Sequence, residues 1–160
     1  LSAAEQFCKK FLPVLENAAA QHYKTPGQAA QGALYVRETA LEQAVDRAGS
    51  GDLNFPGKLC SLTLRRDMEL ELSHLHGNVL VKRLPPGEII PVLRRQRGRL
   101  QTAGLLCPPR SREALSALLA RAGVNRITAP GHMSDTFPGE AHDGEYPLRR
   151  YVRVVDIESP

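Results

Sequence analysis

Histidines beside acidic residues or glycines are the side chains of this sequence best suited to chemistry near neutral pH. His74 and His76 stand two apart, just before Gly77 and an apolar run, and His142 is followed directly by Asp143 and Gly144. Residues two apart on a strand share a face, so the first two histidines can line one pocket. An aspartate beside a histidine can hold one imidazole tautomer, and a glycine lets the backbone approach a ligand. The simpler interpretations are surface histidines and an Asp-Gly turn.

Other polar residues offer weaker alternatives. Glu140, just before His142, could serve as a base. His74 and His76 together with His132 or His142 could form a three-histidine metal site, but nothing in their spacing fixes their convergence. No cysteine or glutamate stands at a metal-motif spacing, so the sequence predicts no metal ion.

The cysteines and the composition indicate an ordinary globular protein. Cys8, Cys60 and Cys107 are odd in number, widely spaced and without a CxxC pair, which favours buried free thiols in a reducing cytoplasm. The length of 160 residues predicts one domain over residues 1–160, and 42% hydrophobic and 24% charged residues are typical of a globular protein. No apolar run approaches the roughly 18 residues that a membrane span needs, and the first residues do not resemble a signal peptide.

Arginines are clustered, although the formal net charge is only +4. One run holds Arg94, Arg95, Arg97 and Arg99, and a second holds Arg149, Arg150 and Arg153. Such clusters attract phosphates or nucleic acid, although a solvated surface is the simpler interpretation. A small anion- or nucleic-acid-binding module using the run from 94 to 99 is therefore an alternative function. The low aromatic content, 5%, offers few rings on which bases could stack.

Two helices are expected at the start of the chain. Ser2 and Glu5 form a capping box for the first helix, which Pro13 should kink or split. Thr25 with Pro26 starts the second helix, which ends before a glycine-rich loop over residues 49–57. The expected apolar stripe of the second helix is Ala30, Leu34, Leu41 and Val45.

Strands and helices then alternate. Apolar runs predict strands over 58–64, 68–72, 77–84 and 151–157, a short helix over 88–97 and a loop over 132–146. The segment from Gly98 to Pro130 reads as strand, helix and strand, with Ser111 able to cap the helix and Gly123 to end it. A βαβ unit of this kind has parallel strands and a right-handed crossover, which predicts the α/β class.

Five blocks, taken in order, resemble one family. They are Leu75–Val81, Gly98–Gly104, Leu118–Thr128, Pro138–Gly144 and Val152–Glu158. Each is similar to a block of the fatty acyl-CoA reductases of the bacterial bioluminescence type, which belong to the aldehyde dehydrogenase superfamily. The resemblance runs from about residue 75 to residue 158 and is looser before it.

The resemblance implies a fold and an activity. It implies a three-layer, mostly parallel sheet, like the C-terminal half of an aldehyde dehydrogenase catalytic domain. The implied reaction converts a fatty acyl thioester of coenzyme A or of acyl-carrier protein into an aldehyde with NADPH, through a cysteine acyl-enzyme. The nucleophile and the cofactor domain would lie outside this chain, so we expect no catalytic residue here, an inactive chain on its own, and the rest of the reductase or a second copy as partner. Neither a membrane nor a nucleic acid is implied.

The resemblance also assigns roles to residues. His74 stands where the superfamily has a glutamate that contacts the nicotinamide ribose, and His76 where it has an aromatic residue that packs on the nicotinamide; Gly77 follows them. His142, Asp143 and Gly144 fall in the loop that lines the substrate pocket. A non-catalytic scaffold descended from the reductase fold is a further alternative.

Overall fold

The computed structural model describes residues 2–72, 75–153 and 155–158 and shows a mixed α/β chain. Its contacts divide the chain into two compact units, unit 1 (Leu1–Leu84) and unit 2 (Pro85–Pro160). A single domain over residues 1–160 stays a prediction.

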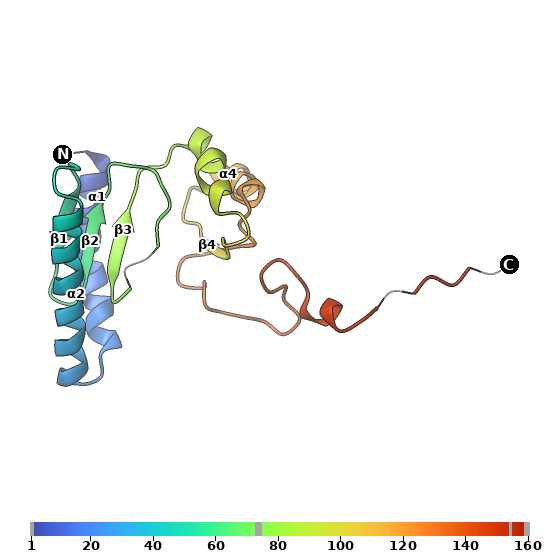
Figure 1. Cartoon of the computed structure of the whole chain (residues 1–160), viewed down its shortest axis with the longest axis horizontal. Coiled ribbons are helices and arrows are strands. Elements are labelled where there is room, and N and C mark those ends of the chain that lie inside the picture. The colour runs from blue at the N-terminus through green and yellow to red at the C-terminus, as the bar shows by residue number, and fades with distance from the viewer. Residues whose placement is uncertain (1, 73–74, 154, 159–160) are drawn as a thin grey trace. The chain divides into compact units, whose positions relative to one another are not determined.

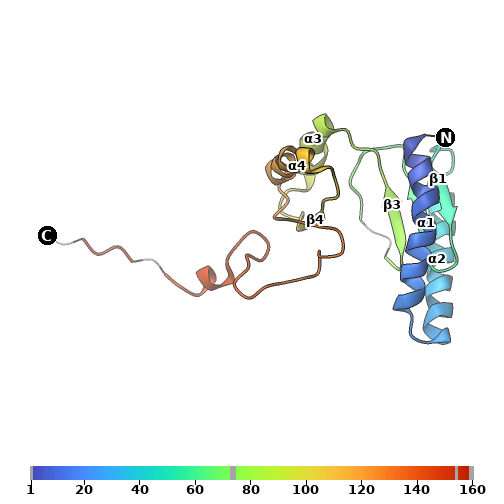
Figure 2. The ribbon, with the colours of Figure 1, turned by 180° about the vertical axis from the view of Figure 1, so that it is seen from behind.

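Unit 1 is a three-stranded sheet with a helix on each face (Figures 1 and 2). Its elements are α1 (Ala3–His22), α2 (Pro26–Asp46), β1 (Leu53–Pro56), β2 (Ser61–Leu64) and β3 (Asn78–Val81). β2 lies in the centre, antiparallel to β1 and parallel to β3. The sheet is therefore mixed, and the larger, mostly parallel sheet of an aldehyde dehydrogenase stays a prediction.

Side chains along β2 point alternately to the two faces of the sheet, so each helix covers a different set of residues. Leu62 and Leu64 face α1, where they form the buried core with Cys8. Thr63 points to the other face, where its hydroxyl donates to the Oε1 atom of Gln43 on α2 at 3.0 Å. One face of the sheet is thus packed with apolar side chains, and the other carries the buried hydroxyl of Thr63, which is paired with α2.

The predicted apolar stripe of α2 is wrong. Leu34, Leu41 and Val45 are 54%, 67% and 67% exposed, and the buried residues of the helix are Gly32, Val36 and Gln43. The physical reason is that α2 covers the polar face of β2, where a glutamine is a better partner than a leucine. Apolar content along the helix therefore did not identify its buried face.

The helix starts follow the sequence more closely. Ser2 and Glu5 form the predicted capping box, and the Thr25 side chain accepts the Gln28 N–H at the start of α2. α1 continues through Pro13 as one helix and is not split.

Three strand predictions need correction. β1 lies inside the segment that we expected to be a loop, where it pairs with β2. The segment 68–72 forms no strand, because its neighbouring carboxylates hold a turn: Asp67 Oδ1 accepts the Glu69 N–H at 3.1 Å. The described residues of 151–157 form no strand either, and Val152 and Val155 are well exposed.

Unit 2 contains the predicted βαβ unit. Its elements are η1 (Pro86–Glu88), α3 (Ile89–Leu93), η2 (Arg94–Gln96), β4 (Thr102–Gly104), α4 (Pro109–Ala122), β5 (Arg126–Thr128) and η3 (Pro147–Arg150). β4 and β5 are parallel and α4 connects them. Gly123 ends α4 with φ 110°, as predicted. The helix starts at Pro109, earlier than the predicted cap, so Ser111 lies inside its first turn.

Candidate functional site

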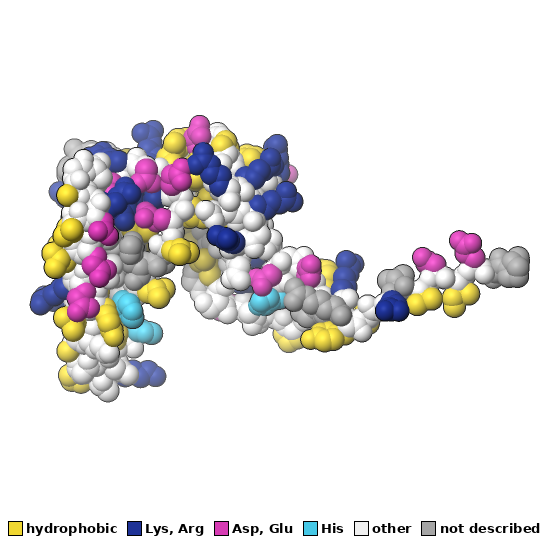
Figure 3. Space-filling view, viewed as in Figure 1, with side chains coloured by type: hydrophobic (Ala, Val, Ile, Leu, Met, Phe, Trp, Pro, Cys, Tyr) yellow, Lys and Arg dark blue, Asp and Glu magenta, His cyan; other side chains and the backbone are white. Residues whose placement is uncertain are grey.

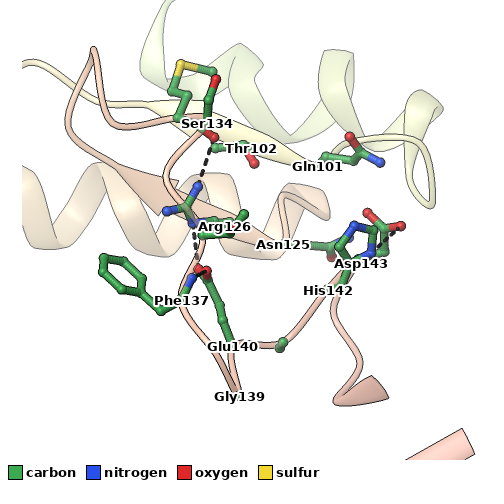
Figure 4. A pocket seen from close by; sticks show the side chains of 13 residues that line it. Gln101, Thr102, Asn125, Arg126, Ser134, Phe137, Gly139, Glu140, His142 and Asp143 are labelled. Carbon is green, nitrogen blue, oxygen red and sulfur yellow. Dashed lines mark hydrogen bonds and ion pairs between the residues drawn. The ribbon is translucent and has the colours of Figure 1, made fainter. Parts of the chain in front are cut away.

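Unit 2 has a cavity of about 380 Å³ at the N-terminal ends of β4 and β5 (Figure 4). The strand ends contribute four residues, Gln101, Thr102, Asn125 and Arg126, and the rest of the lining comes from the loop over residues 133–143. The predicted loop therefore forms one wall of a pocket, and the βαβ unit forms the other.

Arg126 holds this loop in place with all of its nitrogen groups. Nη1 donates to the Met133 carbonyl at 2.9 Å, and Nη2 donates to the Asp135 carbonyl. Nε forms an ion pair with Glu140 Oε1 at 2.7 Å, while Glu140 Oε2 accepts the Phe137 N–H at 3.2 Å. Both oxygens of Glu140 are thus engaged in holding the loop, which argues against the base suggested from the sequence.

His142 and Asp143 both line this cavity. Their side chains are in contact, with His142 Nδ1 3.0 Å from Asp143 Oδ2, and both are solvent-accessible. The backbone of His142 exchanges two hydrogen bonds with Glu145, and the left-handed φ values of Asp143 and Gly144, 53° and 83°, are those of a tight two-residue hairpin turn. The Asp-Gly turn is therefore confirmed, and His142 and Asp143 also line a cavity. A substrate-binding role for this turn stays a prediction.

Gly144 has a packing role beside this pocket. A Cβ atom at this position would lie 3.1 Å from Asn125 Oδ1, and Gly144 is not among the residues that line the cavity. The glycine lets the turn pack against the residue that precedes β5.

A second cavity, of about 590 Å³, lies in unit 1 beside His76. Its lining is polar and aromatic: His22, Tyr23, Lys24, Gln28, Gln31, Gly32, Tyr35 and His76. The His76 ring stacks on the Tyr35 ring, with 4.4 Å between centroids and 20° between planes. His74, the other histidine of the predicted pair, lies outside the described residues.

His76 lies in a turn whose backbone is strained. Leu75, His76 and Gly77 have φ values of 58°, 48° and 75°, which is a conformation that L-residues rarely adopt. Asn78 holds the turn, since its backbone N–H and its side-chain amide both donate to the Leu75 carbonyl, at 2.8 and 3.0 Å. Gly77 does not line the cavity; it packs against the two residues before β2, where a Cβ would lie 3.2 Å from the Leu59 carbonyl oxygen.

Two of the three thiols are unsuited to nucleophilic attack. Cys8 and Cys60 are fully buried. Burial raises the pKa of Cys8, and burial together with a hydrogen bond from Sγ to Glu16 Oε1 at 3.2 Å raises the pKa of Cys60 to about 12. Because the thiolate is the reactive form, burial and a raised pKa make both thiols poor nucleophiles. Cys107 is half-buried.

An ion-pair ring closes the C-terminal ends of β2 and β3. Six side chains of alternating charge form it, each 2.6–3.0 Å from the next: Arg47, Asp52, Arg65, Glu71, Lys82 and Asp67. The hydrogen bond from Lys82, aided by Arg47, lowers the pKa of Asp67 to about 2. Burial opposes ionisation of Asp52, but hydrogen bonds from the Arg66 N–H and from Arg47 and Arg65 outweigh it, so its pKa is also lowered.

Sequence reasoning missed Arg126, Tyr35 and the ion-pair ring. Arg126 gave no signal, because an arginine at the start of a short strand matches no motif. Tyr35 lies 41 positions from the histidine that it contacts, so only the fold brings them together. The members of the ring are likewise scattered from residue 47 to residue 82.

Neither a metal-ligand cluster nor a membrane-spanning helix is found within residues 2–72, 75–153 and 155–158. No three His, Cys, Asp or Glu side chains converge there as metal ligands. None of the helices there combines the length and apolar character that crossing a bilayer requires.

The cavity in unit 2 and the βαβ unit behind it define an α/β protein with a loop-walled pocket. The family model described as acyl-CoA reductase (LuxC) matches residues 57–154, which is more than half of the chain. The chain therefore belongs to this acyl-CoA reductase family, as the resemblance predicted. A comparison with curated proteins found no match.

Proposed function

We propose that this chain supplies pocket walls of a reductase that converts a fatty acyl thioester into an aldehyde with NADPH. The observation that carries the proposal is that the whole cavity of unit 2, lined by residues 101–143, falls inside the matched range 57–154. The acyl group would be delivered by coenzyme A or by acyl-carrier protein.

The lining of this cavity supports an acyl ligand. Met133, Phe137 and Ala141 give it an apolar part, while Gln101, Asn125 and His142 give it polar groups. An apolar cavity with a few polar groups is typical of ligand sites. In the proposed complex the acyl chain packs on Phe137 and Met133, and the His142–Asp143–Gly144 turn borders the thioester end.

The reaction needs a thiolate that attacks the thioester carbon, so that the thiol of the carrier leaves and an acyl-enzyme remains. The burial and the raised pKa values of Cys8 and Cys60 support a nucleophile outside this chain. The chain alone is then inactive, and its partners are the rest of the reductase or a second copy. Free thiols also support a reducing, cytoplasmic setting.

The cavity beside His76 fits part of a nicotinamide cofactor. The stacked rings of His76 and Tyr35 offer a flat surface for an aromatic ring, and Lys24 and His22 can face phosphate oxygens. His74 and Gly77 belong to the same proposed cofactor segment. When bound, a reduced nicotinamide supplies a hydride. The residues of this chain would orient the ring and pair with the phosphates.

The proposed domain is the C-terminal half of an aldehyde dehydrogenase catalytic domain. Two observations support it: the helix–sheet–helix layering of unit 1 and the parallel βαβ unit of unit 2. The three-layer, mostly parallel sheet of that domain would extend beyond the short strands described.

Calorimetric titration with dodecanoyl-CoA tests the acyl site. We expect Phe137→Ala to weaken binding about tenfold, because it removes a ring from the apolar wall, roughly 1.5–3 kcal/mol of burial. Leu148→Ala, at an exposed leucine that does not line the cavity, is the control and should leave binding unchanged. Equal affinities of both variants and the parent chain would contradict the acyl site. Reduction of dodecanoyl-CoA by the chain alone would contradict the external nucleophile.

A further inference from the structure

Five arginines of unit 2 lie on the two segments that lead into the strand ends lining its cavity. Arg94, Arg95, Arg97 and Arg99 lie on the turn between α3 and β4, and Arg121 lies at the end of α4; all five are exposed. Arg94 Nη2 donates to the Arg121 carbonyl at 3.3 Å, so the two segments are in contact. These five residues are called the arginine rim.

The arginine rim and the cavity lie at the same end of the β4–β5 sheet. Arg97 packs on Gly123, where a Cβ would lie 2.9 Å from Arg97 Cγ, and Asn125 of the cavity follows two residues later. Arg99 precedes the cavity residue Gln101 by two positions. The Gln101 carbonyl accepts the N–H groups of Asn125 and Arg126 at 3.1 and 2.9 Å. These bonds join the segment that leads into β4 to the segment that leads into β5.

This end of unit 2 is strongly basic. Between residues 94 and 122 the sequence contains seven arginines and one acidic residue, Glu113. Five of the seven form the arginine rim, and the other two, Arg110 and Arg112, lie in the first turn of α4, away from the rim. Basic side chains gather over α3 and α4 in the space-filling view (Figure 3). An arginine fork matches phosphate oxygens in pairs, and its flat face stacks on aromatic rings.

We propose that the arginine rim binds the 3′-phospho-ADP end of coenzyme A, while the acyl arm of the same molecule enters the cavity. This inference rests on the proposed function, since it assigns the carrier of the acyl group. Three phosphates and an adenine match a rim that has several guanidinium groups beside a pocket with an apolar wall.

Nucleic acid is a poorer match to the same arginines. Binding of single strands relies on aromatic rings interleaved with positive charge. No Phe, Tyr, Trp or His occurs between residues 94 and 131. The alternative of a nucleic-acid module becomes an outcome of the test.

The test compares ligands and a pair of matched variants of the 160-residue chain. Titrations use dodecanoyl-CoA, dodecanoyl-(3′-dephospho)-CoA and dodecanoyl-pantetheine. We expect loss of the 3′-phosphate to weaken binding severalfold, and loss of the whole nucleotide to weaken it about a hundredfold. The double variant Arg94→Gln with Arg99→Gln should weaken dodecanoyl-CoA binding about tenfold and leave dodecanoyl-pantetheine binding unchanged.

The control removes two arginines from the other end of α4. Arg110→Gln with Arg112→Gln makes the same change of charge in the first turn of the helix and should alter affinity less than twofold. Circular dichroism checks the folding of both double variants, and the comparison of the three ligands needs no variant at all.

The outcomes separate this inference from the proposed function. Equal binding of dodecanoyl-CoA and dodecanoyl-pantetheine, sensitive to Phe137→Ala, would overturn the arginine rim and keep the acyl site. Binding of coenzyme A that neither the acyl chain nor Phe137→Ala changes would support the rim and overturn the acyl site. Tight, steeply salt-dependent binding of a 20-nucleotide single strand, without binding of dodecanoyl-CoA, would overturn both in favour of a nucleic-acid module.

Discussion

Gly77 shows how one residue serves both the fold and the proposed cofactor segment. Its φ of 75° and the nearby Leu59 carbonyl leave no room for a side chain, and its own carbonyl accepts the Ser61 N–H at 3.1 Å. The glycine thereby starts β3 at the correct register while the chain turns sharply to expose His76. The sequence pointed to this glycine through resemblance, but its contact with β2 required the fold.

We expect Gly77→Ala to destabilise the chain by about 1–3 kcal/mol, because alanine is strained at this φ and its Cβ meets the start of β2. Urea unfolding measures the change. Gly27→Ala is the matched control, because a Cβ there has open space inside a helix, and it should be neutral or slightly stabilising. Equal effects of the two variants would show that β3 does not start in this conformation.

The thiols differ in reactivity. At pH 8 iodoacetamide should modify Cys107 first, because Cys8 and Cys60 are fully buried and the pKa of Cys60 is raised to about 12. Peptide mass mapping over time measures the order, with urea-unfolded chain as the control in which all three react. Early modification of Cys60 in the folded chain would contradict its burial.

At the scale of elements, α2 is the clearest case of a misleading pattern. Its leucines suggested the buried face, but a glutamine, a valine and a glycine occupy it instead. Helix ends and the βαβ unit were predictable, because caps, prolines and glycines act locally. The buried face of a helix depends on the partner surface, which a local pattern does not contain.

Two substitutions on α2 test this assignment. Val36→Ala should cost about 2 kcal/mol of unfolding free energy, because Val36 is buried. Leu41→Ala should change it by less than about 0.5 kcal/mol, because Leu41 faces solvent. Thermal unfolding of the two variants gives the comparison, and the reverse order would restore the stripe expected from the sequence.

The ion-pair ring predicts a cost for losing one member. Asp52→Ala should destabilise the chain by about 3–5 kcal/mol, because it leaves the almost fully buried Arg65 without one of its partners. Glu38→Ala, at an exposed acidic residue of α2, is the control and should have little effect. Urea unfolding at neutral pH measures both.

The ring also predicts a dependence on pH. The pKa values of Asp52, Asp67 and Glu71 are lowered in the folded state, that of Asp67 to about 2, against roughly 4 when unfolded. A lowered carboxyl pKa contributes stability that is fully present above the unfolded pKa and is lost as pH falls toward the folded pKa. Unfolding free energy should therefore fall from about pH 4 to pH 2, and less steeply in the Asp52→Ala variant.

At the scale of the whole molecule, the core is unevenly distributed. The buried cluster of Cys8, Leu62 and Leu64 belongs to unit 1. In the described part of unit 2, the buried hydrophobic residues are Ile89 and Ala122. The composition indicated a globular protein but could not say where its core would lie. That distribution arises from strand pairing between residues far apart in sequence.

Hydrogen exchange should follow this distribution. We expect the amides of β2 to exchange slowest, since β2 is paired on both sides and covered by buried side chains. The amides of residues 131–146 should exchange fastest among segments that line a cavity, because their side chains are mostly exposed. Slower exchange in that loop than in β2 would contradict the position of the core.

The ion-pair ring has a consequence for warm conditions. The energetic penalty for removing charges from water falls as temperature rises, whereas hydrophobic stabilisation levels off. The ring joins the ends of β2 and β3. The pairing of these strands should therefore be weakened less by heating than the pairing of the short strands of unit 2. On heating, the cavity of unit 2 should therefore open before the three-stranded sheet of unit 1 separates.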